Sequence, residues 1–347
     1  MVMHNSFSIV LHEAPAIPGL VFRHFRGEAD LPNIAAVVNA SFAADKNSER
    51  ITAEGLANIY AHPVHWDPQQ DTLLVEVNGT LIGYANTEWR EEDGARPHFI
   101  NLYLVTEWRG CSLELAMQRH MERCARVAAA AEPNGARHWF ASKVPETWQA
   151  CVEMLRASGY TPVRYYFEMQ RPLLDDNLPE AVLPTGLALR PPLPEHYRAI
   201  WEAGEECFRD QQDYVAPGEE SYRAWVATPH RDPSLWLVAW DGDQVAGAAI
   251  NVIHTGAWGE TDDLFVRHPW RKRGLGRALL VGSLHLFKAR GLTTAGLGVD
   301  AENVSGALGL YESVGFRPYQ RLASYRKLLP PMMRPSATNG RAFKGEL

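Results

Sequence analysis

The sequence predicts an α/β (α+β) chain that contains two copies of one fold, and three observations lead to this prediction. Several short segments of the first half recur in the second half in the same order. Each half contains two alternating apolar runs joined by Asn-Gly or Asp-Gly, the pattern of a β-hairpin. Between residues 264 and 286 the hydrophobic period changes from two to about 3.6, as a strand followed by a helix requires.

The internal repeat is visible as four pairs of matched segments. They are residues 19–23 with 186–190, the hairpin 73–85 with 236–249, Trp108 and Arg109 with Trp270 and Arg271, and residues 158–160 with 314–316. The third pair lies 162 positions apart and the fourth 156 positions apart. Because the order is kept throughout, the two halves are expected to be copies of one fold.

These matches predict a domain boundary near the middle of the chain. We expect an N-terminal domain at residues 1–172, a proline-containing linker at 173–186 and a C-terminal domain at 187–329. Residues 330–347 have neither periodicity nor apolar content, so we expect a disordered tail there. With 347 residues, the chain is long enough for each domain to bury its own core.

The composition is that of an ordinary globular protein, with 46% hydrophobic and 22% charged residues. A formal net charge of −7 argues against nucleic acid as a partner. No apolar run is long enough to cross a membrane, and residues 1–11 lack the features of a signal peptide. We therefore expect a cytoplasmic protein without a membrane partner, present as a monomer or homodimer.

Neither the cysteines nor the histidines predict a metal site. The four cysteines lack Cys-x-x-Cys spacing, so we expect buried thiols without a disulfide framework. His62 and His65 have Pro63 between them and no second ligand pair of suitable spacing, which favours a solvated loop. The sequence therefore predicts no bound metal.

A basic loop that contains two glycines joins the predicted strand to the predicted helix. Leu264, Phe265 and Val266 form the strand, and apolar residues recur at spacings of three and four from Leu275 to Leu286. A loop at a helix start exposes unpaired backbone N–H groups, and the helix dipole adds positive potential at the same point. Such a loop favours an anion, and we expect a ligand that carries a pyrophosphate.

The side chains of this loop strengthen the expectation. The basic residues are Arg271, Lys272, Arg273 and Arg277. Gly274 and Gly276 let a phosphate approach the backbone, because they have no side chain. The loop is not a Walker A loop, since no Lys-Ser or Lys-Thr follows the glycines. It is not a Rossmann turn, since Leu279 stands where a third glycine is required.

The loop Arg271-Lys272-Arg273-Gly274-Leu275-Gly276 resembles motif A of the GNAT superfamily of acetyl-CoA-dependent N-acetyltransferases. Further along the chain, Asn303, Tyr311 and the pair Gly315-Phe316 resemble the motif B region of that superfamily. These features follow one another in the family's order within about 60 residues, which is more specific than any single motif. The resemblance covers residues 187–329.

This resemblance implies two tandem GNAT-like domains, each a mixed, mostly antiparallel twisted sheet flanked by helices. It implies that acetyl-CoA binds to the C-terminal domain as a co-substrate. Backbone N–H groups of Leu264 and Val266 would bind the pantetheine amides and the thioester oxygen, and Tyr311 would protonate the departing thiolate. The residues implied in binding acetyl-CoA are Leu264, Phe265, Val266, Arg271, Lys272, Arg273, Gly274, Leu275, Gly276, Arg277 and Asn303.

Three acids near the start of the strand are candidates for the general base, which takes a proton from the acceptor amine. Glu260 is the first choice, because its position resembles that of the base in several GNAT members. It lies about 13 Å from Leu264 along an ideal strand, so it needs a water molecule or a β-bulge to act. Asp262 is the second choice, and alternation places Asp263 on the opposite face. All three could instead be solvated acids that attract a cationic amine.

The repeat allows the two copies to be compared position by position. At the offset of 162, Gly276 is replaced by Glu114, which brings a carboxylate into the phosphate loop. At the offset of 156, Tyr311 is replaced by Leu155. We therefore predict that the N-terminal domain is degenerate, binds no coenzyme and has a structural or substrate-shaping role.

The sequence thus predicts acetyl transfer from acetyl-CoA to a primary amine, carried out by the C-terminal domain. The acceptor would be a small molecule or a peptide, and its pocket is expected at residues 196–231, where aromatic and acidic residues suit a cationic amine. The tandem layout also resembles mycothiol synthase, which acetylates an amino sugar conjugate. The alternatives are a non-catalytic acetyl-CoA-binding sensor or scaffold, and a transferase that uses another acyl donor.

Overall fold

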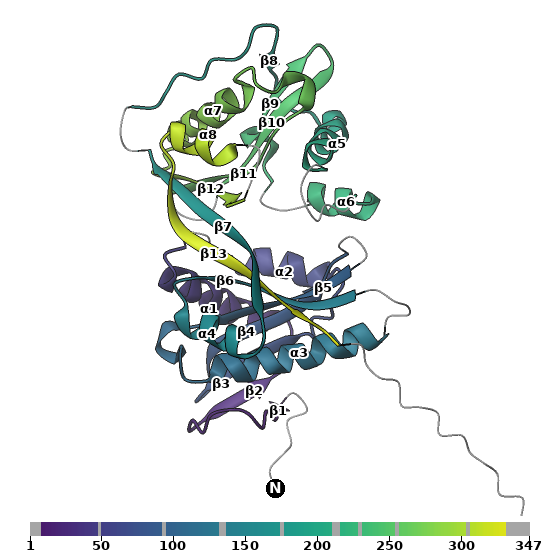
Figure 1. The fold of residues 1–347 in the computed structure, drawn as a ribbon, viewed down its shortest axis with the longest axis vertical. Coiled ribbons are helices and arrows are strands. Elements are labelled where there is room, and N and C mark those ends of the chain that lie inside the picture. Colours follow the sequence, from purple (N-terminus) through teal and green to yellow (C-terminus); the bar gives the residue numbers. More distant parts are fainter. Residues whose placement is uncertain are drawn as a thin grey trace, which may run out of the picture.

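The computed structural model describes residues 8–47, 50–91, 95–131, 137–173, 177–209, 216–227, 231–253, 257–302 and 306–330 (Figure 1). The strands of the first half are β1 (Ser8–Ile9), β2 (Leu20–Arg23), β3 (Thr72–Val77), β4 (Thr80–Trp89), β5 (Ala95–Leu104), β6 (Arg137–Pro145) and β7 (Thr161–Pro172). Those of the second half are β8 (Ala188–Leu189), β9 (Leu237–Asp241), β10 (Gln244–Ile253), β11 (Trp258–Val266), β12 (Thr294–Asp300) and β13 (Arg317–Leu328).

Eight α-helices accompany these strands within the described ranges. They are α1 (Leu31–Ala44), α2 (Ala53–Ala61), α3 (Leu113–Ala131), α4 (Gln149–Ala157), α5 (Tyr197–Phe208), α6 (Glu219–Ala227), α7 (Leu275–Ala289) and α8 (Ala307–Ser313). The helices lie against the sheet in both halves of the molecule (Figure 1). The α/β fold class expected from the sequence is confirmed, with helices beside a mixed sheet in both halves.

The sheet is mixed and mostly antiparallel, as predicted. In the described part of the chain, β5 with β6 and β11 with β12 are the parallel pairs, and the other neighbouring strands run antiparallel. Each parallel pair is joined by a long helix, α3 in the first half and α7 in the second. A helix is the usual crossover between parallel strands, so the strand–loop–helix pattern of the sequence has the expected structural meaning.

The two halves share one continuous sheet, because each half places its last strand in the other half. The strand order is β1-β2-β3-β4-β5-β6-β13-β7-β12-β11-β10-β9-β8. Strand β7 of the first half pairs with β12, and β13 of the second half pairs with β6. Figure 1 shows β7 and β13 as long strands that run side by side between the two halves. The boundary expected at 172 lies between the sequence repeats, whereas the sheet continues across it.

Both predicted hairpins are confirmed, but their turns differ. In the first, Val77 pairs with Thr80, and both Asn78 and Gly79 have positive φ angles, as a type I′ turn requires. In the second, Asp241 pairs with Gln244, so the turn residues are 242 and 243 rather than the predicted Asp-Gly pair. Gly242 has a φ of 55°, which fits the first central position of a type II′ turn.

The second half builds its core from two helices on opposite faces of the sheet. Phe265 of β11 packs on the α5 side, where an added Cβ on Gly204 would lie 3.2 Å from its ring. Leu264 and Val266, the neighbours of Phe265 in the strand, pack with Leu275 of α7 on the other side. This alternation fixes which residues of β11 face each helix.

The segment predicted as a linker, residues 173–186, packs against the second half. Leu173 is fully buried in a cluster with residues of α7 and α8. A ring nitrogen of His285 in α7 lies 2.8 Å from the Pro179 carbonyl oxygen, and Arg273 donates to the Thr185 carbonyl oxygen at 3.0 Å. The tail expected to be disordered lies, from residue 331 onward, outside the described residues.

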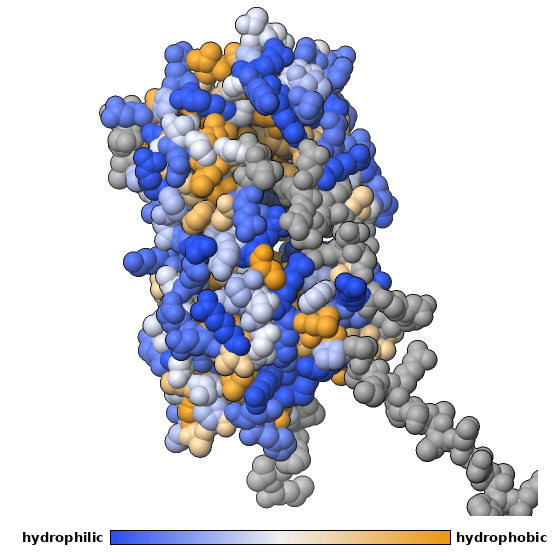
Figure 2. All heavy atoms as spheres, in the orientation of Figure 1, coloured by the Kyte–Doolittle hydropathy of each residue, from blue (hydrophilic) through white to orange (hydrophobic). Residues whose placement is uncertain are grey.

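Among the described residues, no helix is both long enough and apolar enough to cross a membrane. The face shown in Figure 2 is mainly hydrophilic, with apolar side chains in separate patches.

Candidate active site

Strands β11 and β12 run together at one end and separate at the other. Within the described residues they pair from Trp258 to Glu260 of β11 and from Thr294 to Gly296 of β12. Beyond this point β11 continues to Val266 beside β10, whereas β12 continues to Asp300 beside β7. The edge of β11 that bears Leu264 and Val266 therefore faces the gap between the strands. An extended ligand can add to an edge of this kind through backbone hydrogen bonds.

The basic loop begins α7 at the open end of this gap. Lys272 and Gly274 have φ angles of 59° and 86°, and this left-handed backbone turns the chain into the helix at Leu275. Gly276 lies between Val266 of β11 and Leu310 of α8, because an added Cβ would meet a side-chain carbon of each at 3.6 Å. The loop, the strand end and α8 thus converge at Gly276.

The side chains of the loop divide into two groups. Arg271, Lys272, Arg273 and Arg277 are exposed, and Arg271 donates to the Val266 carbonyl oxygen at 3.0 Å. Leu275 is 1% exposed and packs in the core under the helix. Phe265 is also buried, on the α5 face. The side chains of Leu275 and Phe265 therefore belong to the core, and their backbone is the part that can reach a ligand.

Tyr311 lies in α8, one residue after Leu310. Its side chain is 9% exposed and belongs to the buried cluster that α7, α8 and β12 form. Burial raises the pKa of the Tyr311 hydroxyl above its ordinary value near 10, so the group stays protonated at neutral pH. Asn303, the other residue expected from motif B, lies outside the described residues.

A β-bulge reorganises the acids of β11. Asn251 of β10 is opposite Thr261 and Ile250 is opposite Asp263, so Asp262 is the extra residue of the bulge. The buried Thr261 hydroxyl donates to the Asn251 side-chain oxygen at 2.9 Å, and this hydrogen bond lies beside the bulge. After the bulge the alternation is shifted by one residue, which places Asp263 on the α5 face with Phe265.

One arginine contacts both aspartates. Arg231 Nη2 lies 3.1 Å from Asp262 Oδ2, and Arg231 Nη1 lies 3.7 Å from Asp263 Oδ2. The prediction that Asp262 and Asp263 lie on opposite faces is therefore wrong, because it assumed a strand without a bulge. Glu260 comes two residues after Trp258, before the bulge, and its Cα is paired with Gly296.

The pKa of the Asp263 carboxyl is raised by its surroundings. Burial raises its pKa to about 6, the nearby Asp262 and Glu205 carboxylates add to the rise, and Arg231 opposes it. Sequence reasoning set Asp263 aside and missed Arg231. Two adjacent acids inside a strand were a signal for a bulge, since regular alternation would point one of them into the core. No local pattern distinguishes Arg231 from other loop arginines.

Aromatic rings of the expected acceptor region, residues 196–231, form a row that continues to Trp236. Successive ring centroids are 5.4 Å apart for Trp201 and Tyr222, 6.4 Å for Tyr222 and Trp225, and 5.0 Å for Trp225 and Trp236. Glu206 instead forms an ion pair with Arg267 at 2.8 Å. This row lies on the same side of the sheet as Asp263, because α5 and α6 form that layer.

The other candidate groups of the sequence are not brought together. A ring nitrogen of His62 lies 3.1 Å from the Asn58 carbonyl oxygen, while His65 stacks on Trp89 with the ring centroids 3.8 Å apart. No group of three or more His, Cys, Asp or Glu suited to a metal ion occurs among the residues that the structure describes. All four cysteines are free, but the expectation of buried thiols holds for Cys151 alone, because Cys111 is exposed and Cys124 and Cys207 are half-buried.

The matching loop of the first half has the same backbone conformation, but a side chain of the protein fills the space that is open in the second half. Gly110 and Ser112 have φ angles of 79° and 64°, as Lys272 and Gly274 do 162 positions later. Glu114, which stands at the position of Gly276, is 3% exposed and accepts a hydrogen bond from the Gly110 N–H at 2.6 Å. A carboxylate of the chain itself therefore occupies the anion position at the start of α3.

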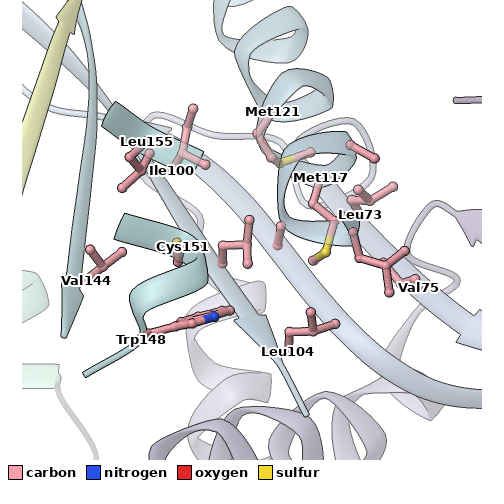
Figure 3. Close-up of a cluster of buried hydrophobic side chains, with 14 of the residues drawn as sticks. Leu73, Val75, Ile100, Leu104, Met117, Met121, Val144, Trp148, Cys151 and Leu155 are labelled. Atoms are coloured by element: carbon pink, nitrogen blue, oxygen red, sulfur yellow. The ribbon is translucent and has the colours of Figure 1, made fainter. Parts of the chain in front are cut away.

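The neighbouring groups of the first half are also satisfied internally. Arg109 forms a two-pronged ion pair with Asp45, at 2.8 and 2.7 Å, and stacks on Trp148. Leu104, the counterpart of Val266, is 0% exposed, and it shares a buried cluster with Trp148 and Val144 (Figure 3). The strand ends that separate in the second half are bridged here by buried apolar side chains.

Comparison with known proteins agrees with this geometry. A family model described as the acetyltransferase (GNAT) family matches residues 194–316, which include the loop, the bulged strand and α8. These residues belong to the GNAT family of acetyltransferases. A GCN5-related N-acetyltransferase from Sphaerobacter thermophilus has a TM-score of 0.72 and 26% identity, over 90% of this chain and 97% of that one.

Other relatives match either about half of the chain or most of it. The mycothiol acetyltransferase of Streptomyces scabiei is 28% identical over 260 residues, covering 73% of this chain and 79% of that protein. The mycothiol acetyltransferase of Thermomonospora curvata is 36% identical over 165 residues, or 47% of this chain. This match spans only about half of that relative, 55% of its length. A tandem GNAT protein from the clavulanic acid biosynthesis pathway shares the fold, with a TM-score of 0.64 at 14% identity over 90% of this chain and 100% of that one.

Proposed function

We propose that this protein transfers the acetyl group of acetyl-CoA to a primary amine, and that the C-terminal domain, residues 187–329, carries the reaction. One observation carries the proposal. Both halves contain the same left-handed loop before a long helix, but only Gly276 leaves the loop open, while Glu114 closes it with a carboxylate.

The groups around the loop suit the parts of acetyl-CoA. Exposed backbone at the start of α7 and four basic side chains suit the pyrophosphate. The edge of β11 at Leu264 and Val266 suits the amide groups of the pantetheine arm, because the arm can pair with it as a strand would. We assign Asn303 to the same arm on the family resemblance alone.

The chemistry needs a neutral amine, a stabilised thioester oxygen and a protonated leaving group. Backbone N–H groups on the open edge of β11 can serve the thioester oxygen. Tyr311, held protonated by its burial, can give its proton to the thiolate sulfur. The acids of β11 supply the base, with Glu260 and Asp262 as the residues expected from the sequence.

The acceptor side is the layer formed by α5 and α6. Aromatic rings and carboxylates there suit an amine that is cationic before it reacts. Relatives named mycothiol acetyltransferases make the amine of a small-molecule conjugate the first acceptor to test. The cytoplasmic location and the monomeric or dimeric state expected from the sequence stay predictions.

Calorimetric titration of acetyl-CoA tests the proposal directly. We expect one molecule bound per chain, and at least about 100-fold weaker binding in Gly276→Glu, because like charges placed together cost several kcal/mol. The new Cβ has room, since its nearest neighbours are side-chain carbons at 3.6 Å. Ala289→Glu is the matched control, because it adds the same charge to an exposed position at the far end of α7.

Two outcomes would contradict the proposal. Two molecules bound per chain, or unchanged binding in Gly276→Glu, would remove the assignment of acetyl-CoA to the second half. Tight binding without turnover across a broad amine panel would instead support a sensor or scaffold.

A further inference from the structure

Asp263 is the acid that lies nearest to the proposed thioester position. It directly precedes Leu264, a separation of about 3.3 Å along a strand, whereas Glu260 is four residues away. Phe265, two residues after Asp263, packs on the α5 side of the sheet. Both acids lie on the α5 side of the sheet, but Asp263 adjoins the gap between β11 and β12, whereas Glu260 lies where the two strands are still paired.

Arg231 is placed to control this carboxyl. Its guanidinium contacts Asp262 and Asp263 at 3.1 and 3.7 Å and lies 5.1 Å from the ring centroid of Trp225. The Arg231 side chain is only 15% exposed, so solvent screens its charge less than it would at the surface. The contacts involve two acids and one ring, which restrict where the guanidinium can lie.

The charges that face Asp263 come from three elements. Asp262 belongs to its own strand and Glu205 to α5, and both carboxylates disfavour a second negative charge. Arg231, from the segment after α6, is the positive group that favours it. With a pKa of about 6, Asp263 is ionised at neutral pH and is a stronger base than an ordinary aspartate.

We propose that Asp263 is the catalytic residue that takes a proton from the acceptor ammonium, and that Arg231 is a positioning residue that orients the carboxylate and keeps it ionised. This inference rests on the proposed function. The neutral amine then forms a C–N bond to the acetyl carbon as the C–S bond breaks. Tyr311 gives a proton to the sulfur and regains one from the nitrogen, and Asp263 releases its proton to solvent.

Carboxyl NMR tests the role of Arg231 without any need for turnover. In protein labelled at the aspartate side-chain carbon, the Asp263 resonance is the one lost in Asp263→Asn. We expect its titration midpoint to rise by about one pH unit or more in Arg231→Gln, because an opposite charge at this range lowers a carboxyl pKa by about that amount. Arg321→Gln is the control, since it removes an arginine paired with the remote Glu146.

The pH profile of kcat/KM tests the proton transfer itself. In Arg231→Gln, we expect the midpoint pH of the acid limb to rise by the same amount as the NMR midpoint. In Arg231→Lys this midpoint pH should return toward the original value, and in Arg321→Gln it should not change. Asp263→Asn should lower kcat/KM by about 100-fold or more while acetyl-CoA binds with unchanged affinity, which also shows that the variant is folded.

Two results would overturn the inference. The first is that neither the midpoint pH of the acid limb nor the NMR titration midpoint of Asp263 changes in Arg231→Gln. The second is that Asp263→Asn turns over as fast as the unaltered protein. No turnover of the unaltered protein with any amine would overturn the proposed function and with it the proton transfer. The NMR midpoint would still decide whether Arg231 controls the charge of Asp263.

Discussion

At the scale of single residues, the surroundings of Tyr311 set what its hydroxyl can do. The ring packs edge-on against Phe316, with centroids 6.4 Å apart, in the cluster between α7, α8 and β12. Burial in this apolar site disfavours the phenolate and raises the hydroxyl pKa. A phenol that stays neutral has a proton to give, as the protonation of a departing thiolate requires.

We predict that Tyr311→Phe lowers kcat by about 100-fold, the usual size of a general-acid contribution. The KM for acetyl-CoA should change little, because the ring and its packing are kept. Steady-state kinetics with a reactive amine measures both constants. Tyr325→Phe is the matched control, because the Tyr325 hydroxyl is buried in the core cluster of the first half and lacks a hydrogen-bond partner among the described residues. Equal losses in both variants would argue against a role for Tyr311.

At the scale of elements, the pairing of β11 with β12 supports the acceptor face. Trp258 of β11 lies across Gly296 of β12 and packs edge-on against Tyr319 of β13, with centroids 6.1 Å apart. An added Cβ on Gly296 would overlap the indole at Cζ2 and Cε2. Glu260 is two residues after Trp258, so displacement of the indole would also disturb the start of the acid run.

We predict that Gly296→Ala destabilises the protein by about 1–3 kcal/mol, the usual range for overpacking in a buried site. The midpoint of thermal or urea unfolding measures the effect. Gly298→Ala is the control in the same strand, since its Cβ would meet only the end of the Glu168 side chain at 3.4 Å. An unchanged midpoint in Gly296→Ala would mean that the indole can move without cost.

At the scale of the whole molecule, the exchange of β7 and β13 interlocks the two halves. Strand β7 pairs with β12 on one side and with β13 on the other, and β13 also pairs with β6. Arg171 of β7 strengthens the junction through its hydrogen bond to the Val314 carbonyl oxygen after α8. Neither half completes its sheet from its own sequence repeat.

We predict that residues 187–330 expressed alone are insoluble, because β12 and β13 then expose edges that β7 and β6 cover in the whole chain. Co-expression of residues 1–186 with 187–330 should yield a complex that elutes as one species on gel filtration. Two separately folded, monomeric halves would contradict the interlocked arrangement.

The first half shows how little sequence change is needed to alter a site on a preserved backbone. The left-handed angles of the two loops match, although Lys272 and Gly274 correspond to Gly110 and Ser112. The decisive difference is the Glu114 carboxylate, which accepts the Gly110 N–H that an anion could otherwise use. This position could be read from the sequence, since the offset of the repeat alone pairs it with Gly276.

The sequence by itself determined the two copies, their hairpins, the strand–loop–helix segment and the open loop at Gly276. These features depend on local rules, because apolar periodicity, turn residues and glycine conformations act within a few residues. Tertiary structure alone decided the exchange of β7 and β13, since backbone pairing between strands carries little information about which edge a distant strand joins. It also decided which face of the sheet the acids of β11 occupy and which charge they contact. The bulge depends on how β11 pairs with β10, and Arg231 contacts Asp263 from a segment about 30 residues earlier. Local periodicity cannot register contacts that two distant segments make only after the sheet has formed.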